Sequence, residues 1–221
     1  MLMKESRELI ASYARRMSAE GFNAAASGNI SIIDRQSNTI AITPSGLDYL
    51  EMGPEDIVVC GMEGNILEGN HKPSSEFGLH RVFYDLRPDC TSVIHTHSIY
   101  CTTFAVLRRP LMAVHYAITG AGVTEIPVVP YRTFGTPELA DATAEVLREN
   151  ATRAVLLANH GMIAAHLDIA KAYDLAVNLE FLAEIQYRAE CIGIPHVLTE
   201  EEMQDAFERF KTYGVNVDKS I

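Results

Sequence analysis

Residues 92–100, SVIHTHSIY, place His95 and His97 two positions apart at the end of an apolar run. The run predicts a buried β-strand. Side chains two apart in a strand point to the same face, so both imidazoles can reach one metal ion with little backbone strain. Histidines that only stack or hydrogen-bond are also common in half-buried sheets. The motif alone therefore leaves two interpretations open, a metal site and a structural pair.

Helix-like and strand-like segments alternate around this strand. Apolar residues at helical spacing predict helices over residues 3–20, 75–87, 136–150, 168–191 and 199–214, and one more that ends at residue 107. Short β-rich runs predict strands over residues 29–34, 39–44, 57–61, 65–69, 92–97, 111–116 and 154–158. Turn-prone residues separate the first four strands, which predicts hairpins with antiparallel pairing.

Two helix starts carry recognisable capping residues. Thr136 can cap a helix whose first residue is Pro137, and Thr199 with Glu202 predicts a capping box. No shift in composition suggests a linker. The chain is therefore expected to form one domain over residues 1–221, an α/β fold with a central mainly antiparallel or mixed β-sheet flanked by helices.

The composition limits the classes of partner. The formal net charge of -11 repels nucleic acid and anionic membranes, so we expect neither as a partner. The first twenty residues are too charged for a signal peptide or a membrane span, which favours a cytoplasmic protein. An anionic substrate would have to be held by local neutral donors, such as backbone N–H groups and hydroxyls, because the chain as a whole is acidic.

A third histidine stands at the end of another apolar strand. His160 follows the strand predicted at residues 154–158 and precedes Gly161, a position where α/β enzymes place reactive groups. Three neutral imidazoles are a usual protein set for a catalytic divalent metal, and zinc suits these ligands. The other five histidines lack paired spacing and are expected to be structural or exposed: His71, His80, His115, His166 and His196.

Three short turns are rich in small and hydroxyl residues: SGN at 27–29, TPSG at 43–46 and KPSSE at 72–76. The last of these precedes a helix, so its hydroxyls and free N–H groups gather at a positive dipole end beside Glu76. Ordinary turn chemistry and a serine cap with a first-turn glutamate explain the same residues. Together, however, the three turns could build an anion pocket from neutral donors.

These motifs resemble, in the same order along nearly the whole chain, those of the class II aldolase/adducin family. Within it they are most similar to those of the members that cleave L-fuculose 1-phosphate. The matching segments are SGN at 27–29, TPSG at 43–46, KPSSE at 72–76, HTH at 95–97, YRTFGT at 131–136, NHG at 159–161 and FKTYG at 210–214. The resemblance implies a domain of αβα layers.

The resemblance also implies an active site. His95, His97 and His160 match the family's ligands for one Zn²⁺ per chain, and Glu76 matches the carboxylate that acts as catalytic acid and base and can approach the metal. Six residues match the family's phosphate-binding segments: Gly28, Asn29, Ser45, Gly46, Ser74 and Ser75.

Two tyrosines match catalytic residues that the family supplies from an adjoining subunit and its tail, Tyr116 and Tyr213. The resemblance therefore implies a homotetramer with active sites at subunit interfaces.

The implied reaction is the reversible cleavage of a ketose 1-phosphate to dihydroxyacetone phosphate and a short aldehyde such as L-lactaldehyde. It would proceed through a metal-stabilised enediolate, with Glu76 moving the C3 proton and Tyr116 the proton on the C4 oxygen. Lys72 is not expected to form a Schiff base.

Several family activities compete with this one. They are 5-deoxyribulose-1-phosphate aldolase, L-ribulose-5-phosphate 4-epimerase and methylthioribulose-1-phosphate dehydratase, and Glu76 disfavours the epimerase, which usually carries aspartate there. A non-catalytic adducin-like scaffold is the alternative from a different class. It is disfavoured because its ligand histidines are typically degraded, whereas all three stand in this chain.

Overall fold

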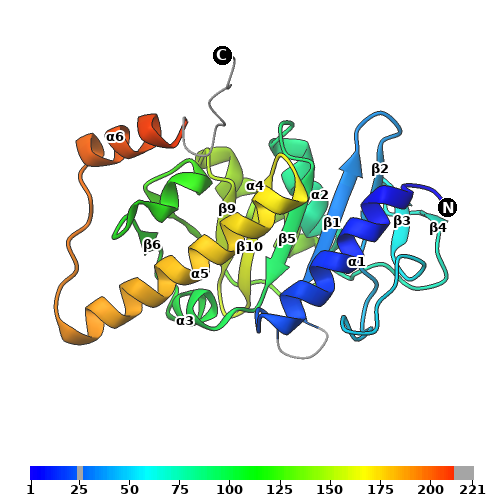
Figure 1. The fold of residues 1–221 in the computed structure, drawn as a ribbon, viewed down its shortest axis with the longest axis horizontal. Coiled ribbons are helices and arrows are strands. Elements are labelled where there is room, and N and C mark those ends of the chain that lie inside the picture. Colours follow the sequence, from blue (N-terminus) through cyan, green and yellow to red (C-terminus); the bar gives the residue numbers. More distant parts are fainter. Residues whose placement is uncertain (24–26, 212–221) are drawn as a thin grey trace, which may run out of the picture.

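A central sheet of eight strands organises the computed structural model, which describes residues 1–23 and 27–211 (Figure 1). The strand order across it is β4-β3-β2-β1-β5-β10-β9-β8. The strands are β1 (Asn29–Asp34), β2 (Thr39–Ile42), β3 (Val58–Gly61), β4 (Ile66–Glu68), β5 (Ser92–Thr96), β8 (Val128–Val129), β9 (Ala154–Leu157) and β10 (Gly161–His166). A second sheet pairs β6 (Leu111–Met112) with β7 (Glu125–Ile126).

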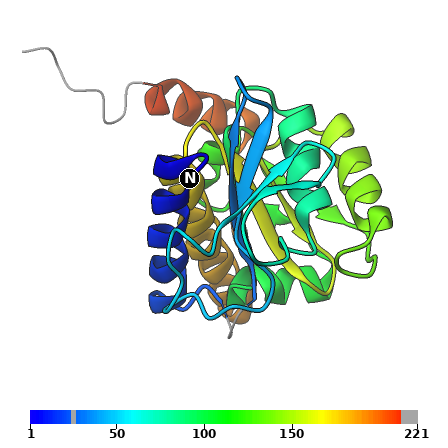
Figure 2. The ribbon, with the colours of Figure 1, turned by 90° about the vertical axis from the view of Figure 1, so that its right-hand side faces the viewer.

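Six helices and one 3₁₀ segment complete the part of the chain that the structure describes. They are α1 (Lys4–Ala19), α2 (Phe77–Leu86), α3 (Ile99–Leu107), η1 (Tyr116–Ala121), α4 (Pro137–Glu149), α5 (Ile169–Ile192) and α6 (Glu200–Phe210). Figure 2 shows the sheet edge-on, with α1 and α5 on one face and α2 and α4 on the other. This is the three-layered α/β fold that the sequence predicts.

The core lies on both faces of the sheet because neighbouring side chains of a buried strand point in opposite directions. In β5, Ile94 packs in the core under α1, α3 and α5, whereas Val93 packs in the core under α2 and α4. Both side chains are fully buried. Burying an aliphatic side chain of this size stabilises the fold by roughly 1.5–3 kcal/mol, so β5 ties the two layers together.

The strand pairing confirms a mixed, mainly antiparallel sheet. Within residues 1–23 and 27–211, β8 and β9 are parallel and all the other neighbouring strands are antiparallel. The predicted hairpins are confirmed as β1–β2 and β3–β4. The capping box at Thr199 and Glu202 is also confirmed, and the predicted end of that helix at residue 214 lies outside the described residues.

Two expectations are wrong, and one strand is missing from the predicted set. Thr136 precedes α4 but its hydroxyl donates to the Thr133 carbonyl at 2.7 Å instead of capping the helix. The strand expected over residues 111–116 ends at Met112, because the chain bends at residues 113–115 before it enters η1. Residues 161–166, for which the sequence pattern predicts no element, form β10, the strand beside β5.

No helix among residues 1–23 and 27–211 is both long and apolar enough to cross a membrane.

Candidate active site

Three histidines meet at one end of the central strands. His95 is the fourth residue of β5, His97 follows the strand, and His160 lies in the turn between β9 and β10. Their candidate ligand atoms all lie within 4.8 Å of one another, and the Nε2 atoms of His95 and His97 are 3.0 Å apart. Because β10 pairs with β5, the turn that carries His160 is held against the strand that carries His95.

The hydrogen bonding of His95 directs one nitrogen toward this centre. Its Nδ1 lies 2.8 Å from the main-chain carbonyl of Met162. A carbonyl only accepts, so Nδ1 carries the hydrogen and Nε2 keeps its lone pair. A carbonyl partner on the far nitrogen is the usual arrangement of a metal-binding histidine.

Burial keeps the three imidazoles neutral. It lowers the pKa of His95 to about 3, and the neighbouring Glu76 carboxylate only partly opposes this effect. Burial and then the neighbouring His160 lower the pKa of His97, and burial lowers the pKa of His160. Neutral imidazoles that share one small volume are the donor set of a divalent metal, so these residues fit the metal that the sequence resemblance implies.

Glu76 faces the same centre from the N-terminus of α2, where it is the N-cap residue and 6% exposed. Its Oε2 lies 3.3 Å from Nε2 of His95, and its Oε1 lies 3.3 Å from Nε2 of His160. Asn29 donates a hydrogen bond of 2.8 Å to Oε2, while Oε1 is buried with no hydrogen-bond partner among the described residues. One carboxylate oxygen is thus held and the other is available.

The environment of Glu76 favours its ionised form. Burial raises the pKa of the carboxyl, but attraction to His95 and His160, which acts only where those rings are protonated, and the hydrogen bond from Asn29 outweigh burial, so that the pKa lies below its ordinary value. An ionised carboxylate with a free oxygen can accept a proton or bind a cation.

A pocket of about 300 Å³ opens beside the histidines. It is lined by Ser27, Gly28, Asn29, Pro44, Ser45, Gly46, Ser74, Ser75, Glu76, His97, Phe134 and His160. All six residues predicted to bind phosphate are among them. None of the described lining residues is lysine or arginine, so an anion here would be bound by neutral donors, as the acidic composition requires.

Two of the predicted segments are held together by their main chains. Ser45 donates its N–H to the Lys72 carbonyl at 3.1 Å, and Ser74 donates its N–H to the Thr43 carbonyl at 3.0 Å. Lys72 itself is exposed and does not line the pocket.

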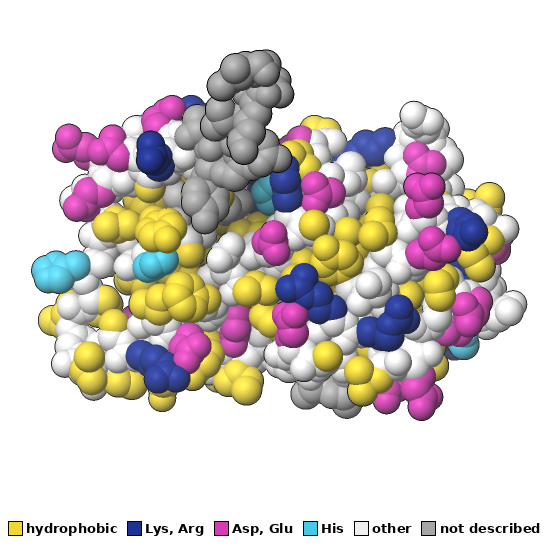
Figure 3. All heavy atoms as spheres, viewed as in Figure 1, with side chains coloured by type: hydrophobic (Ala, Val, Ile, Leu, Met, Phe, Trp, Pro, Cys, Tyr) yellow, Lys and Arg dark blue, Asp and Glu magenta, His cyan; other side chains and the backbone are white. Residues whose placement is uncertain are grey.

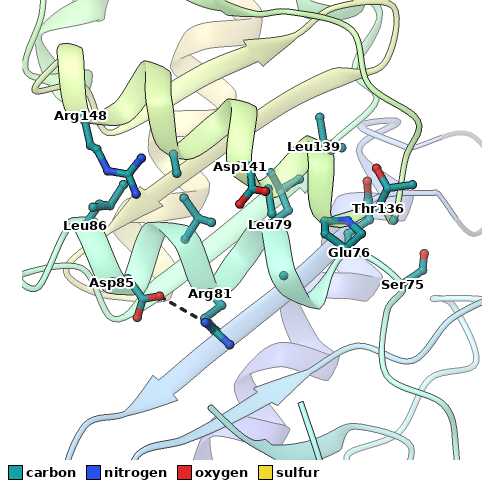
Figure 4. Close-up of a pocket in the computed structure, with 16 residues that line it drawn as sticks. Ser75, Glu76, Leu79, Arg81, Asp85, Leu86, Thr136, Leu139, Asp141 and Arg148 are labelled. Carbon is teal, nitrogen blue, oxygen red and sulfur yellow. Dashed lines mark hydrogen bonds and ion pairs between the residues drawn. The ribbon is translucent and has the colours of Figure 1, made fainter. Parts of the chain in front are cut away.

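A larger groove of about 470 Å³ runs between α2 and α4 (Figure 4). Ser75, Glu76 and Thr136 lie together at one end, and Arg81 pairs with Asp85 farther along at 3.4 Å. The three histidines do not line this groove. The smaller pocket is therefore the candidate active site.

The two predicted tyrosines are not joined to this site within one chain. Tyr116 begins η1, is 56% exposed and packs against the ring of His115, and it does not line the pocket. Tyr213 lies outside the described residues. Their assignment to a neighbouring subunit's site stays a prediction.

Sequence reasoning missed one residue near the centre, His80. It is fully buried on α2, and its ring contacts Asn29 and Ser31. The sequence does hold one indication that His80 lies near Glu76: the two are four residues apart, and residues four apart in a helix lie on one face.

Known proteins resemble the chain over almost its full length. The family described as Class II Aldolase and Adducin N-terminal domain matches residues 8–187. A 5-deoxy-D-ribulose 1-phosphate aldolase of Bacillus thuringiensis serovar kurstaki is 44% identical over 214 residues, covering 97% of this chain and 99% of that protein.

A 5-methylthioribulose-1-phosphate/5-deoxyribulose-1-phosphate aldolase of Escherichia coli is 39% identical over 211 residues, covering 94% of this chain and 96% of that protein. A solved structure of an L-fuculose 1-phosphate aldolase superposes with a TM-score of 0.91 at 38% identity, covering 96% of this chain and 98% of that one.

Proposed function

The chain belongs to the class II aldolase and adducin family, and from this premise we propose that it reversibly cleaves a ketose 1-phosphate to dihydroxyacetone phosphate and a short aldehyde. The observation that carries the proposal is one site with three neutral imidazoles, a buried carboxylate with a free oxygen and a pocket of neutral anion donors. The imidazoles, the carboxylate and the pocket each have one role in this reaction.

Breaking the bond between C3 and C4 of a ketose turns the C4 hydroxyl into an aldehyde, and we assign the proton that this hydroxyl loses to Tyr116 of a neighbouring subunit. The electron pair of the broken bond stays on C3, and this carbanion is stable only if its charge passes to the C2 oxygen. A divalent metal held by His95, His97 and His160, which we propose to be Zn²⁺, supplies Lewis-acid stabilisation of that charge when bound. Class II aldolases depend on such a metal.

Glu76 moves the proton at C3. Its Oε1 has no hydrogen-bond partner among the described residues, so it can carry a proton to C3 in cleavage and remove that proton in the reverse reaction. Its Oε2 stays fixed by Asn29. Because its two carboxylate oxygens each lie 3.3 Å from Nε2 of a histidine, one from His95 and one from His160, Glu76 can also approach the metal.

The phosphate occupies the pocket that Gly28, Asn29, Ser45, Gly46, Ser74 and Ser75 line. Main-chain N–H groups and hydroxyls bind it without a lysine or arginine. The positive φ of Gly28 and Gly46, 79° and 74°, suits the tight turns that bring backbone close to a ligand.

The most similar relative named above supports 5-deoxyribulose 1-phosphate as the substrate, which would release acetaldehyde. The solved relative supports L-fuculose 1-phosphate, which would release L-lactaldehyde. We propose 5-deoxyribulose 1-phosphate as the first candidate because the identity is higher over a longer part of the chain.

We further propose a homotetramer whose active sites lie at subunit interfaces, with Tyr116 and Tyr213 supplied by a neighbouring subunit. Exposed aromatic side chains support an interface: Tyr116 is 56%, Phe181 48% and Tyr187 43% exposed. Figure 3 shows hydrophobic side chains gathered over α5 and the region of β6. Such patches commonly mark protein–protein contacts.

A panel of three substrates tests the function: 5-deoxyribulose 1-phosphate, L-fuculose 1-phosphate and L-ribulose 5-phosphate, with coupled detection of dihydroxyacetone phosphate. We expect cleavage of the first two and none of the third. Epimerisation of L-ribulose 5-phosphate without cleavage of the others would overturn the proposal. A purified chain that holds no metal and cleaves none of the three would instead favour a scaffold.

The same assay separates metal binding from proton transfer. Glu76→Gln should keep most of the metal and lose hydrogen exchange at C3 of dihydroxyacetone phosphate by roughly 10²–10⁴-fold, the usual contribution of general acid–base catalysis. His95→Ala should lose both metal and exchange. Metal is measured by elemental analysis and exchange by deuterium loss from labelled dihydroxyacetone phosphate.

A further inference from the structure

A continuous line of buried polar side chains leads away from Glu76 into the layer between α2 and β1. Glu76 and its neighbours His80 and Tyr84 are spaced four residues apart, so they lie on one face at the start of α2 and along it. Asn29 and Ser31 are two apart in β1 and share the face turned toward α2. All five residues are at most 6% exposed.

Each of these side chains contacts the next. The Tyr84 hydroxyl lies 2.7 Å from Oγ of Ser31, and that oxygen lies 2.6 Å from Nδ1 of His80. Nε2 of His80 contacts Oδ1 of Asn29, whose Nδ2 donates to Oε2 of Glu76 at 2.8 Å. The line thus ends on the carboxylate of the active site.

Chemistry fixes the direction of every hydrogen bond once that end is known. The amide nitrogen of Asn29 faces Oε2 of Glu76 and its amide oxygen faces Nε2 of His80. That amide oxygen only accepts, so Nε2 of His80 carries a hydrogen. Burial lowers the pKa of His80 to about 3, so its ring is neutral at neutral pH and Nδ1 is an acceptor.

It follows that Ser31 donates to His80 and Tyr84 donates to Ser31. Every donor in the line points toward Glu76, an arrangement in which hydrogen bonds strengthen one another. The second hydrogen on the Asn29 nitrogen takes no part in these bonds, so it can donate to a ligand in the pocket that Asn29 lines.

We propose that His80 is a positioning residue of this enzyme: by donating from Nε2 to Asn29 it fixes the Asn29 amide so that this amide holds one oxygen of Glu76 and leaves the other free. The proposal rests on the proposed function of Glu76. The main-chain N–H of His80 donates to the Glu76 carbonyl in the first turn of α2, but the His80 side chain makes no hydrogen bond to the Glu76 carboxylate and does not line the pocket. Its hydrogen bond to Asn29 is therefore the contact through which the ring can orient that carboxylate.

Two isosteric variants separate positioning from packing. In His80→Gln, the amide nitrogen reaches the place of Nε2 and can still donate to Asn29. In His80→Asn, the shorter amide reaches only the place of Nδ1, near Ser31. Both put an amide into the same buried space, so their effects on folding should be similar, and thermal unfolding measures this.

We expect His80→Gln to keep hydrogen exchange at C3 of dihydroxyacetone phosphate within roughly 3-fold of the unmodified enzyme. His80→Asn should lower kcat for exchange roughly 10- to 100-fold, with KM and metal content nearly unchanged, the size typical of an outer partner of an active-site group. Tyr173→Phe is the control, because it removes a buried hydroxyl bonded to Glu20, away from the pocket. Equal activities of the two His80 variants would overturn the proposal.

Combining the His80 variants with Asn29→Ala tests whether His80 acts through Asn29. When Asn29→Ala is also present, the ratio of kcat for exchange in His80→Gln to that in His80→Asn should fall to about one, since His80 would have no amide left to orient. If this ratio were the same with and without Asn29, His80 would not act through Asn29, and the proposal would fail.

A spectroscopic readout stands apart from activity. In the ¹⁵N-histidine NMR spectrum of the metal-free protein, His80 should carry its hydrogen on Nε2 and none on Nδ1. A hydrogen on Nδ1 would overturn the proposal. If the unmodified enzyme exchanged no hydrogen, the proposed function would fail, while this spectrum would still decide the orientation of His80.

Discussion

At the residue scale, Gly161 decides whether His95 and His97 can meet His160. It pairs with Leu157 at the start of β10, and a methyl carbon there would overlap the main-chain oxygen of Thr96. It would also lie 3.0 Å from Cδ2 of His97 and 3.3 Å from Cε1 of His95. Only a residue without a side chain lets the turn approach the strand this closely.

Gly161→Ala should therefore displace the end of β5. We expect metal affinity to fall by about 10-fold or more and the free energy of unfolding to fall by roughly 1–3 kcal/mol, the usual cost of overpacking. Gly193→Ala is the matched control, because a methyl carbon there meets no atom within 4 Å. Calorimetric metal titration and chemical denaturation measure both quantities, and wild-type metal affinity in Gly161→Ala would contradict the argument.

Local spacing makes the three histidines candidates, because a strand fixes the relation of His95 to His97 and the end of an apolar strand marks His160. The choice of a metal site over a structural pair comes from the family resemblance. His80 was predicted to be merely structural or exposed. Its contacts reach Asn29, 51 residues away, and Ser31, 49 residues away. Helical spacing groups His80 with Glu76, but only the packed fold shows that β1 is the strand that α2 faces.

At the scale of elements, a carboxylate from α5 caps the helix that follows His97. Oε1 of Glu180 accepts the N–H of Tyr100 at 2.7 Å, and Oε2 accepts the N–H of Cys101 at 2.8 Å. Ser98, the N-cap residue of α3, makes no capping hydrogen bond with its own side chain. The start of α3 is thus fixed from a different helix, which also fixes the chain just after His97.

Glu180→Ala should leave these two N–H groups without partners. We expect a loss of about 1–2 kcal/mol in the free energy of unfolding, as for other helix caps, and weaker metal binding. Glu184→Ala, one turn further along α5, removes only an exposed pair with Arg188 and should cost at most a few tenths of a kcal/mol, as i,i+4 pairs do. Equal losses in the two variants, measured by urea denaturation, would refute the capping argument.

Most elements follow from periodicity and capping signals, but β10 does not. Its first five residues are buried on both faces, so the run GMIAAH shows no alternation, and the sequence pattern predicts no element there. The turn between them needs a left-handed residue, and Asn159 supplies it with φ 55°. Asparagine is among the few non-glycine residues that adopt this conformation readily, which was the missed signal.

At the scale of the whole molecule, the proposed active site uses residues that one chain does not bring together. Glu76 and His160 meet within a chain, with Oε1 and Nε2 3.3 Å apart. Tyr116, in contrast, is exposed on η1 and does not line their pocket. If Tyr116 acts, it must act in the site of another copy, and this has a consequence for mixed assemblies.

Mixing Glu76→Gln chains with Tyr116→Phe chains should restore activity. In randomly mixed tetramers about a quarter of the sites combine an intact Glu76 with an intact Tyr116 from the neighbouring subunit. Differently tagged chains, refolded together and captured through both tags, allow cleavage by the hybrids to be measured. Glu76→Gln mixed with His160→Ala is the control: both residues belong to one chain's pocket, so no site can regain both. Hybrids of the first pair that stay inactive, or hybrids of the second that recover, would show that Tyr116 does not complete a neighbouring subunit's site.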